Sequence, residues 1–423
     1  MGWLPACVIA AVILRLMAQL ALEALNRMEV RRNALRCPDA LAGIMDAETY
    51  SRSVQYTLAR GWFGSVTAAY DAAVLLALLF SGALPWWWAR ISGVAPGAAW
   101  RGALSIVATL FILWLLELPL AWWSQFRLEE RFGFNNSTPG LWAADRVRLA
   151  LIGLGLGFTM VWAVLSLAGW AGPSWWVPGF ALFFGIQMLM LALYPKLILP
   201  LFNRLSPLPE GDLRTRLLAM ARRTGFRAKA IVTMDGSRRS GHSNAFFAGF
   251  GRFRRIVLFD TLVAQLSQEE LEAVLAHEIG HHKCGHIRKF MALSALLQLG
   301  GFAVVAWLAR TSWLSTAFGL PGGALAPTLL LVVLLGGLVT FWFTPAGNWL
   351  SRRNEFEADA FARNAVGSGA PLVGALRKLS QKNLSNLTPH PAYSMVYYSH
   401  PTLVEREQAL RGRVLPKCPV RMP

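Results

Sequence analysis

The sequence predicts a mainly α-helical membrane protein with seven transmembrane helices and a cytoplasmic metal-binding region that carries a small β-sheet. Of its 423 residues, 55% are hydrophobic, a larger share than ordinary soluble enzymes have. Seven apolar runs are long enough to cross a bilayer. The pentapeptide HEIGH, residues 277–281, follows the fifth run and has the spacing of a metal site on a helix.

The apolar runs divide the chain into four regions. Residues 1–202 hold five spans, 203–288 form a cytoplasmic insert, 289–345 hold spans six and seven, and 346–423 are a second cytoplasmic part. The predicted spans are 3–25, 64–86, 103–123, 149–171, 177–202, 289–309 and 326–345. Asp71 and Glu117 fall within spans, so we expect them to line a polar interior.

The distribution of basic residues among the loops predicts how the chain is oriented in the membrane. The loops after the first, third, fifth and seventh spans are rich in arginine, which predicts that they are cytoplasmic. The first of these loops contains Arg27, Arg31, Arg32, Arg36, Arg52 and Arg60. The N-terminus is then outside, and the C-terminus and both halves of the metal site face the cytoplasm. The net charge of +18 is also compatible with nucleic-acid binding, but the chain has no zinc knuckle or RNA-binding signature, so we expect no nucleic-acid partner.

The HEIGH segment lies in a predicted helix over residues 271–286. His277 and His281 are four residues apart, hence on one face, and can bind one Zn²⁺ ion. Glu278 lies one position round the helix, where it can take a proton from a water molecule held by the metal. Zinc lowers the pKa of such a water to roughly 7. The alternative is an ordinary helix with surface histidines.

A catalytic zinc needs a third protein ligand. Cys284 is a nearby candidate. His282 follows His281 directly and points elsewhere, whereas His286 has neither same-face nor extended metzincin spacing. We interpret His282 and His286 as helix-end or solvent-exposed histidines.

A better third ligand lies downstream, in NEFEADAFA (354–362), which predicts another helix. Glu355 and Asp359 are four residues apart and share a face. Glu355 can complete the zinc ligands, and Asp359 can hydrogen-bond a ligand histidine. The alternative for both is a solvated helix face.

The cytoplasmic parts have further predicted elements. Helices are expected at 210–224, 370–382 and 402–412, and strands at 228–234, 244–250 and 254–260.

Five segments together resemble the type I CAAX prenyl endopeptidases, which are integral-membrane zinc metalloproteases of the gluzincin class. Besides HEIGH and NEFEADAFA, they are LEERFGFNNSTPGLW (128–142), RRSGHSNAFFAGFGRFRRIVLFDTL (238–262) and YSHPTLVEREQAL (398–410). The matches keep the family's order from residue 128 to residue 410. The composition, rich in arginine and tryptophan, is typical of a bacterial member, which predicts a bacterial inner membrane.

The resemblance implies a fold and an activity. Members bind zinc through residues that match His277, His281 and Glu355, with Glu278 as the general base. Seven helices enclose a large water-filled chamber. The implied reaction is hydrolysis of peptide bonds in a peptide or protein substrate, prenylated or not, next to the lipid bilayer.

Further roles rest on the resemblance alone. Asn244 and Ala245 match an edge strand that holds the substrate backbone, which suits strand addition. His400 matches a histidine that stabilises the oxyanion, and Arg406 an arginine near the zinc glutamate. Tyr397 departs from the family, because many members have a histidine there.

Two other functions stay open. The chain could be a general membrane-protein quality-control protease of the HtpX type, although that branch has fewer spans. It could also be a lipid- or isoprenoid-binding membrane protein with a structural zinc, which would need a fourth protein ligand.

Overall fold

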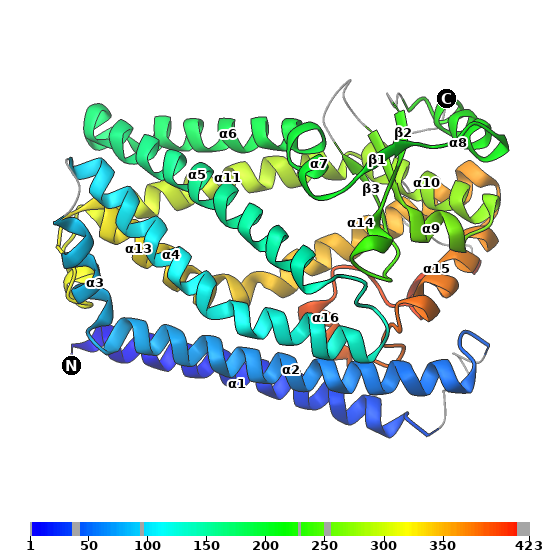
Figure 1. Ribbon diagram of the computed structural model, residues 1–423, viewed down its shortest axis with the longest axis horizontal. Coiled ribbons are helices and arrows are strands. Elements are labelled where there is room, and N and C mark those ends of the chain that lie inside the picture. The colour runs from blue at the N-terminus through cyan, green and yellow to red at the C-terminus, as the bar shows by residue number, and fades with distance from the viewer. Residues whose placement is uncertain (1, 36–42, 94–96, 227–229, 249–254, 413–423) are drawn as a thin grey trace.

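The computed structural model describes residues 2–35, 43–93, 97–226, 230–248 and 255–412. Long helices run along the longest axis of the molecule, and a small sheet with several shorter helices lies at one end (Figure 1). The first helix begins at the end remote from the sheet.

Seven helical segments in the described part of the chain are long and apolar enough to cross a membrane, as predicted. Their helices are α1 (Trp3–Arg32), α2 (Ala47–Phe80), α4 (Ala98–Trp123), α5 (Pro139–Ala171), α6 (Trp176–Leu197), α11 (His286–Ala309) and α13 (Leu325–Thr340). A π-helical stretch, Ser124–Glu129, prolongs α4. The predicted second span ran to residue 86, but α2 ends at Phe80. Gly82 has a φ of 82° and separates α2 from the short α3 (Ala83–Ser92).

A cavity lies between α1, α2, α4 and α13. Its volume is about 380 Å³, and its mostly apolar lining includes Arg15, Asp71 and Glu117. Both acids therefore line a cavity of the bundle, and both are exposed. Ionisable groups within a membrane usually face the interior of the bundle or a cavity.

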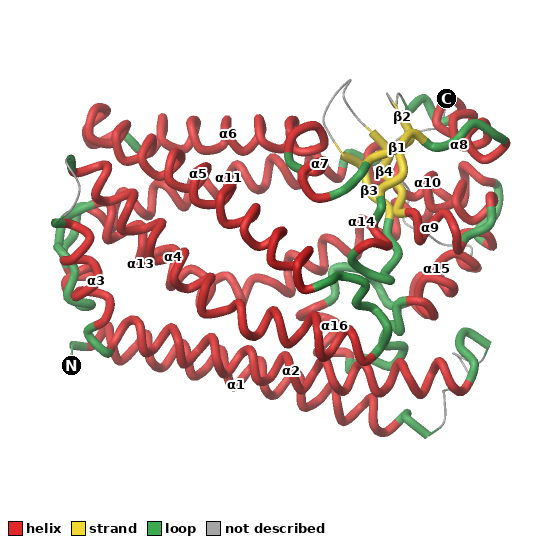
Figure 2. The backbone as a smooth tube through the Cα atoms, viewed as in Figure 1, coloured by secondary structure: helices red, strands yellow, loops and turns green. Residues whose placement is uncertain are grey.

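The small sheet has four strands in the order β1-β2-β4-β3 (Figure 2). They are β1 (Leu205–Pro207), β2 (Ala230–Met234), β3 (Ala245–Ala248) and β4 (Arg255–Phe259). β2 and β4 are parallel, and the outer strands β1 and β3 pair antiparallel with them. The three predicted strands correspond to β2, β3 and β4, while β1 was not predicted. Residues 249–254, between β3 and β4, lie outside the described part.

Shorter helices pack around the sheet. They are α7 (Leu199–Phe202), α8 (Asp212–Arg223), α9 (Asp260–Gln265), α10 (Gln268–Lys283), α14 (Thr344–Val366), α15 (Ala370–Lys382), α16 (Pro391–Tyr397) and α17 (Leu403–Arg411). Another short helix, α12 (Trp313–Thr316), follows α11. One apolar core joins the sheet to α8, α10, α14 and α15, with Leu217, Leu258, Leu275 and Phe361 fully or almost fully buried.

Two of these helices continue membrane helices. The predicted seventh span ends at residue 345, but the helical segment runs from Leu325 to Val366, through a 3-10 turn at Phe341–Phe343. The charged residues after 350 end the apolar run and not the helix. At the sixth span, Cys284 and Gly285 separate α10 from α11, and Gly285 has a φ of 75°. Hence α10 and α14 are both anchored directly to the bundle.

Candidate metal centre

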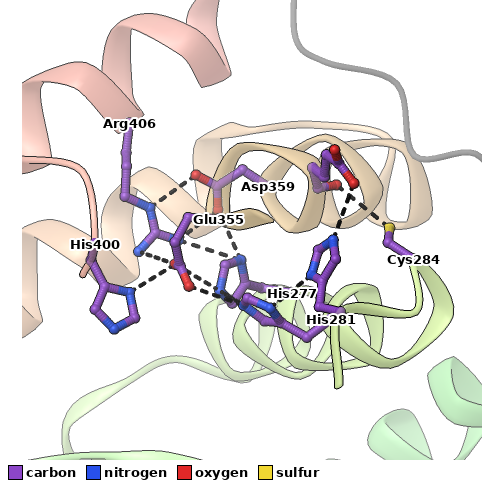
Figure 3. A network of polar contacts seen from close by, with 9 residues as sticks. His277, His281, Cys284, Glu355, Asp359, His400 and Arg406 are labelled. Atoms are coloured by element: carbon purple, nitrogen blue, oxygen red, sulfur yellow. Dashed lines mark hydrogen bonds and ion pairs between the residues drawn. The ribbon is translucent and has the colours of Figure 1, made fainter. Parts of the chain in front are cut away.

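The HEIGH residues lie in the second half of α10. Ser267 begins this helix with a capping box: its hydroxyl accepts from the Glu270 N–H at 3.3 Å, and its own N–H donates to Glu270 Oε2 at 2.8 Å. Most of α10 is buried. The periodicity predicted from sequence therefore places His277 and His281 on one face, and that face meets α14 (Figure 3).

Gly280 allows α10 and α14 to come close together. A Cβ at this position would lie 3.0 Å from the Ala358 Cα, 3.1 Å from the Ala358 backbone oxygen and 3.1 Å from the Phe361 Cβ. Such distances are shorter than packed side chains allow. The small residues at 280 and 358 thus bring the backbones of the two helices within reach of shared ligands.

Three potential ligand atoms converge between these helices. His281 Nε2 lies 3.2 Å from His277 Nε2 and 3.1 Å from Glu355 Oε1, and His277 Nε2 lies 3.4 Å from Glu355 Oε2. His277 and Glu355 are 6% and 3% exposed. The residues predicted as zinc ligands from two distant segments are thus brought together (Figure 3).

Asp359 and Arg406 flank His277. His277 Nδ1 donates to Asp359 Oδ1 at 2.9 Å, and Arg406 Nε donates to Asp359 Oδ2 at 2.9 Å. Burial disfavours a charged His277, but the hydrogen bonds to Asp359 and Glu355 outweigh burial and raise its pKa to about 9. Burial likewise opposes the charge on Arg406, and Asp359 outweighs it, so the pKa of Arg406 is raised.

His281 has a different partner. Its Nδ1 lies 3.0 Å from His286 Nδ1, and His286 Nε2 lies 3.1 Å from Glu357 Oε2. His286 lies at a helix end, as the first residue of α11, but it is only 2% exposed, so its interpretation as a solvent-exposed histidine was wrong. His282 is half-buried, with its ring edge-on to Phe226 at 5.3 Å.

The hydrogen bonds fit a cation between the three ligand atoms. If His277 Nδ1 and His281 Nδ1 carry the protons that they donate, both Nε2 atoms present lone pairs inward, toward a carboxylate. Three acceptors so close together repel one another without a shared cation. The Glu355 carboxylate is 3% exposed, and both of its oxygens face histidine nitrogens of the site. Two imidazoles and one carboxylate are also the donor set of a catalytic zinc site.

Glu278 lies beside these ligands and faces another direction. Burial raises the pKa of its carboxyl. It lines a cavity of about 540 Å³ together with His281 and His286. The rest of this lining is mostly apolar and comes from α6 and α11, which are membrane helices: Phe184, Gln187, Met188, Leu191, Ile287, Phe290, Met291 and Ser294.

A second and larger cavity lies on the other side of the ligands. Its volume is about 980 Å³, and it is lined by His400, Arg406 and Asn244 among others. His400 comes from the loop between α16 and α17, and its Nδ1 lies 2.9 Å from Glu355 Oε2 (Figure 3). Tyr393, Tyr397 and Tyr398 line the wall opposite the sheet.

The edge of the sheet borders this cavity through β3. The Phe259 N–H donates to the Asn244 carbonyl at 3.1 Å, so Asn244 is paired with β4. Because hydrogen bonding alternates along an antiparallel strand, the backbone N–H and carbonyl of Ala245 face the open edge. The Ala245 N–H there meets the Asn244 side chain at 2.8 Å.

Sequence reasoning missed His286 and Glu357. One signal could have found His286. Gly285 follows the last turn of the HEIGH helix, and a glycine at that place commonly ends a helix in a left-handed conformation. A helix that ends there no longer obeys the 3.6-residue period, so His286 is free to turn back toward His281.

Comparisons with known proteins agree with this architecture. Residues 26–204 match the family described as CAAX prenyl protease N-terminal, five membrane helices, and residues 207–414 match peptidase family M48. The chain is 36% identical to a CAAX prenyl protease 1 homolog of Arabidopsis thaliana, over 89% of this chain and 90% of the relative. It is 33% identical to CAAX prenyl protease 1 of Saccharomyces cerevisiae, over 89% of this chain and 88% of the relative.

A solved structure is similar over almost the whole chain. The crystal structure of S. mikatae Ste24p has a TM-score of 0.89 and 30% identity, covering 97% of this chain and 99% of that one. Two family matches in tandem, relatives of equal length and a shared fold all agree with the metal centre described above. The chain therefore belongs to the CAAX prenyl protease 1 family of M48 peptidases and is an integral-membrane metalloendopeptidase.

Proposed function

We propose that this protein is a zinc-dependent endopeptidase that cleaves C-terminal CAAX-type or other membrane-associated peptides. The observation that carries the proposal is the convergence of His277, His281 and Glu355 beside the half-buried Glu278, with a cavity lined by His400 and Arg406 and another lined by α6 and α11. The relatives are named for CAAX processing, and they match this chain from end to end.

Zinc is the proposed metal, with one ion per chain held by His277, His281 and Glu355. A bound zinc ion supplies a Lewis acid and lowers the pKa of water to near neutrality. Glu278 accepts the proton of the attacking water and later delivers it to the leaving amine. Asp359 holds His277 in the tautomer whose Nε2 binds metal, and Arg406 holds Asp359.

His400 is proposed to stabilise the oxyanion of the tetrahedral intermediate. Its side chain is 65% exposed to the larger cavity, and its Nδ1 lies beside the ligand carboxylate, so it can turn toward a bound substrate. A donor already in place at the developing charge is worth more than one recruited from water.

Replacing His400 by alanine should lower kcat by about 10²–10³-fold with little change in KM, because the donor acts on a charge present only in the transition state. Steady-state kinetics of the purified variant measures this. Metal content is the control and should stay at the wild-type level. A rise in KM at unchanged kcat would contradict the oxyanion role.

Asn244 and Ala245 are proposed to bind the substrate backbone. The Ala245 backbone groups face the open edge of β3, and Asn244 lines the larger cavity. An extended peptide can therefore add to this edge by main-chain hydrogen bonds. Its scissile bond would then lie near the metal ligands, since His400 and Arg406 line the same cavity.

The proposed topology places the metal centre on the cytoplasmic side, with the N-terminus outside, in a bacterial inner membrane. The support is the arginine in the loops at the end that holds the sheet, together with the attachment of α10 and α14 to membrane helices. The centre would then meet peptides at the membrane surface.

The substrate class is tested with one peptide that ends in a CAAX box, farnesylated and unmodified. Detergent-purified protein should cleave the farnesylated form with the higher kcat/KM, because a lipid-bearing peptide gains apolar contacts that the unmodified one lacks. The Glu278→Gln protein is the blank, and mass spectrometry of the products gives the cleavage position.

The other outcomes identify the alternatives. Equal cleavage of both peptides would indicate a general membrane protease of the HtpX type. No cleavage above the blank, with zinc bound, would favour a lipid- or isoprenoid-binding protein with a structural zinc, and it would contradict our proposal.

A further inference from the structure

The outward face of His281 is held by a buried chain of contacts that the proposed mechanism does not use. His281 Nδ1 lies 3.0 Å from His286 Nδ1, and His286 Nε2 lies 3.1 Å from Glu357 Oε2. His286 and Glu357 are 2% and 6% exposed, so both side chains are largely shielded from bulk water. Figure 3 shows His281 beside the other proposed ligands, His277 and Glu355, and the contacts with His286 start from its second ring nitrogen.

The contacts are consistent with one set of tautomers. A carboxylate only accepts, so Glu357 requires a proton on His286 Nε2. A neutral His286 then has an unprotonated Nδ1, which accepts the proton of His281 Nδ1. His281 is left with a lone pair on Nε2, and that atom faces His277 Nε2 and Glu355. The chain of contacts therefore determines which nitrogen of His281 can bind a metal.

The backbone brings these residues together at the junction of α10 and α11. Gly285, with a φ of 75°, ends the run of α10, and His286 is the first residue of α11. Glu357 belongs to α14, two residues beyond the proposed ligand Glu355. Arg353 Nε and Lys289 Nζ lie 3.5 and 3.7 Å from its carboxylate oxygens, and these ion pairs help to hold the carboxylate in place.

The same residues, with Cys284, also cluster closely enough to suggest a second metal. The charges argue against it. The Glu357 carboxylate already faces two cationic side chains, which would repel a further cation. The contact of Glu357 with His286 therefore orients His286 and is not part of a metal site.

We propose that His286 and Glu357 are positioning residues that orient His281 for metal binding, as Asp359 does for His277. The inference rests on the proposed zinc set of His277, His281 and Glu355. It makes the two histidines unequal, because His277 is held by a carboxylate directly and His281 through a second imidazole. Loss of such outer partners typically weakens metal affinity by 10–100-fold.

The test measures zinc affinity of the full-length protein in detergent by competition with a chromophoric chelator. His286→Leu removes both contacts and should weaken zinc binding by about 10–100-fold. His286→Asn should recover part of the loss, because its amide oxygen can take the place of Nδ1 and accept from His281. His282→Gln is the matched control, on the helix α10 that carries His281, and it should bind zinc as the wild type does.

A second readout separates positioning from general stability. Zinc should raise the Tm of the wild type much more than that of His286→Leu, because ligand-induced stabilisation follows affinity. A residue that only supports the fold would lower the Tm with and without zinc by the same amount. If His286→Leu does not fold, Glu357→Gln serves instead, with an expected loss of about tenfold.

Two results would overturn the inference: a zinc affinity of His286→Leu equal to the wild type, or an equal loss in His282→Gln. The zinc set itself is checked in the same series by His277→Ala. If that variant keeps the wild-type affinity, the proposed zinc site is wrong. If it loses zinc while His286→Leu does not, the positioning role alone is wrong.

Discussion

The Glu278→Gln protein is expected to bind zinc as tightly as the wild type and to lose about 10²–10⁴-fold in kcat. Glutamine has the size of glutamate and remains hydrogen-bonding, but it cannot accept the proton of the attacking water. Glu278 is not among the converging ligand atoms, so the metal should be retained. Because burial already favours the neutral carboxyl, the neutral amide should not destabilise the fold.

Peptide cleavage and metal content are measured on the same preparation. Glu269→Gln is the matched control, since Glu269 lies on the same helix but forms an exposed ion pair with Arg216. It should cleave normally. Full activity of Glu278→Gln would exclude Glu278 as the base, and loss of its metal would indicate that Glu278 has a ligand role.

The Glu355→Ala protein is expected to lose more than about 100-fold in zinc affinity, and its activity with it. Removal of an outer partner already costs 10–100-fold, and Glu355 is a proposed direct ligand. Its carboxylate also lies 3.5 Å from Arg406, so the variant leaves this guanidinium near the metal position without its partner. The positive charge of Arg406 would oppose cation binding further.

Metal analysis after dialysis and a zinc-dependent thermal shift measure this loss. The variant should show almost no zinc-induced rise in Tm. Glu210→Ala, which changes an exposed carboxylate just before α8, is the control and should keep its zinc. Unchanged zinc stoichiometry in Glu355→Ala would remove Glu355 from the ligand set.

The membrane architecture could be predicted from sequence because its signals are local. An apolar run of sufficient length forms a helix in a bilayer whatever its neighbours do. The exact ends could not be predicted. The helix after residue 340 continues through Arg352 and Arg353 because these residues leave the membrane without leaving the helix. Hydropathy marks the edge of the bilayer and carries no information about where backbone hydrogen bonding stops.

The residues of the metal centre could be predicted where two of them lie on the same helix. His277 and His281 follow from a four-residue spacing, and Glu355 and Asp359 share the same spacing on a second helix. His286 was misinterpreted because the spacing rule was applied across Gly285, where the helix ends. Glu357 had no signal of its own, since a charged residue on a helix is usually solvated. Only the packing of α14 on α10 buries it.

The close packing at Gly280 limits which residues the HEIGH motif tolerates at this position. The third residue after His277 is usually written as unspecified, yet here it determines the gap between two backbones. Even a methyl group would meet Ala358 at 3.0 Å, so α14 would have to move outward and carry Glu355 with it. The spacing of ligands from separate helices thus depends on a residue that never contacts the metal. Selection for binding would act at this position as strictly as on a ligand.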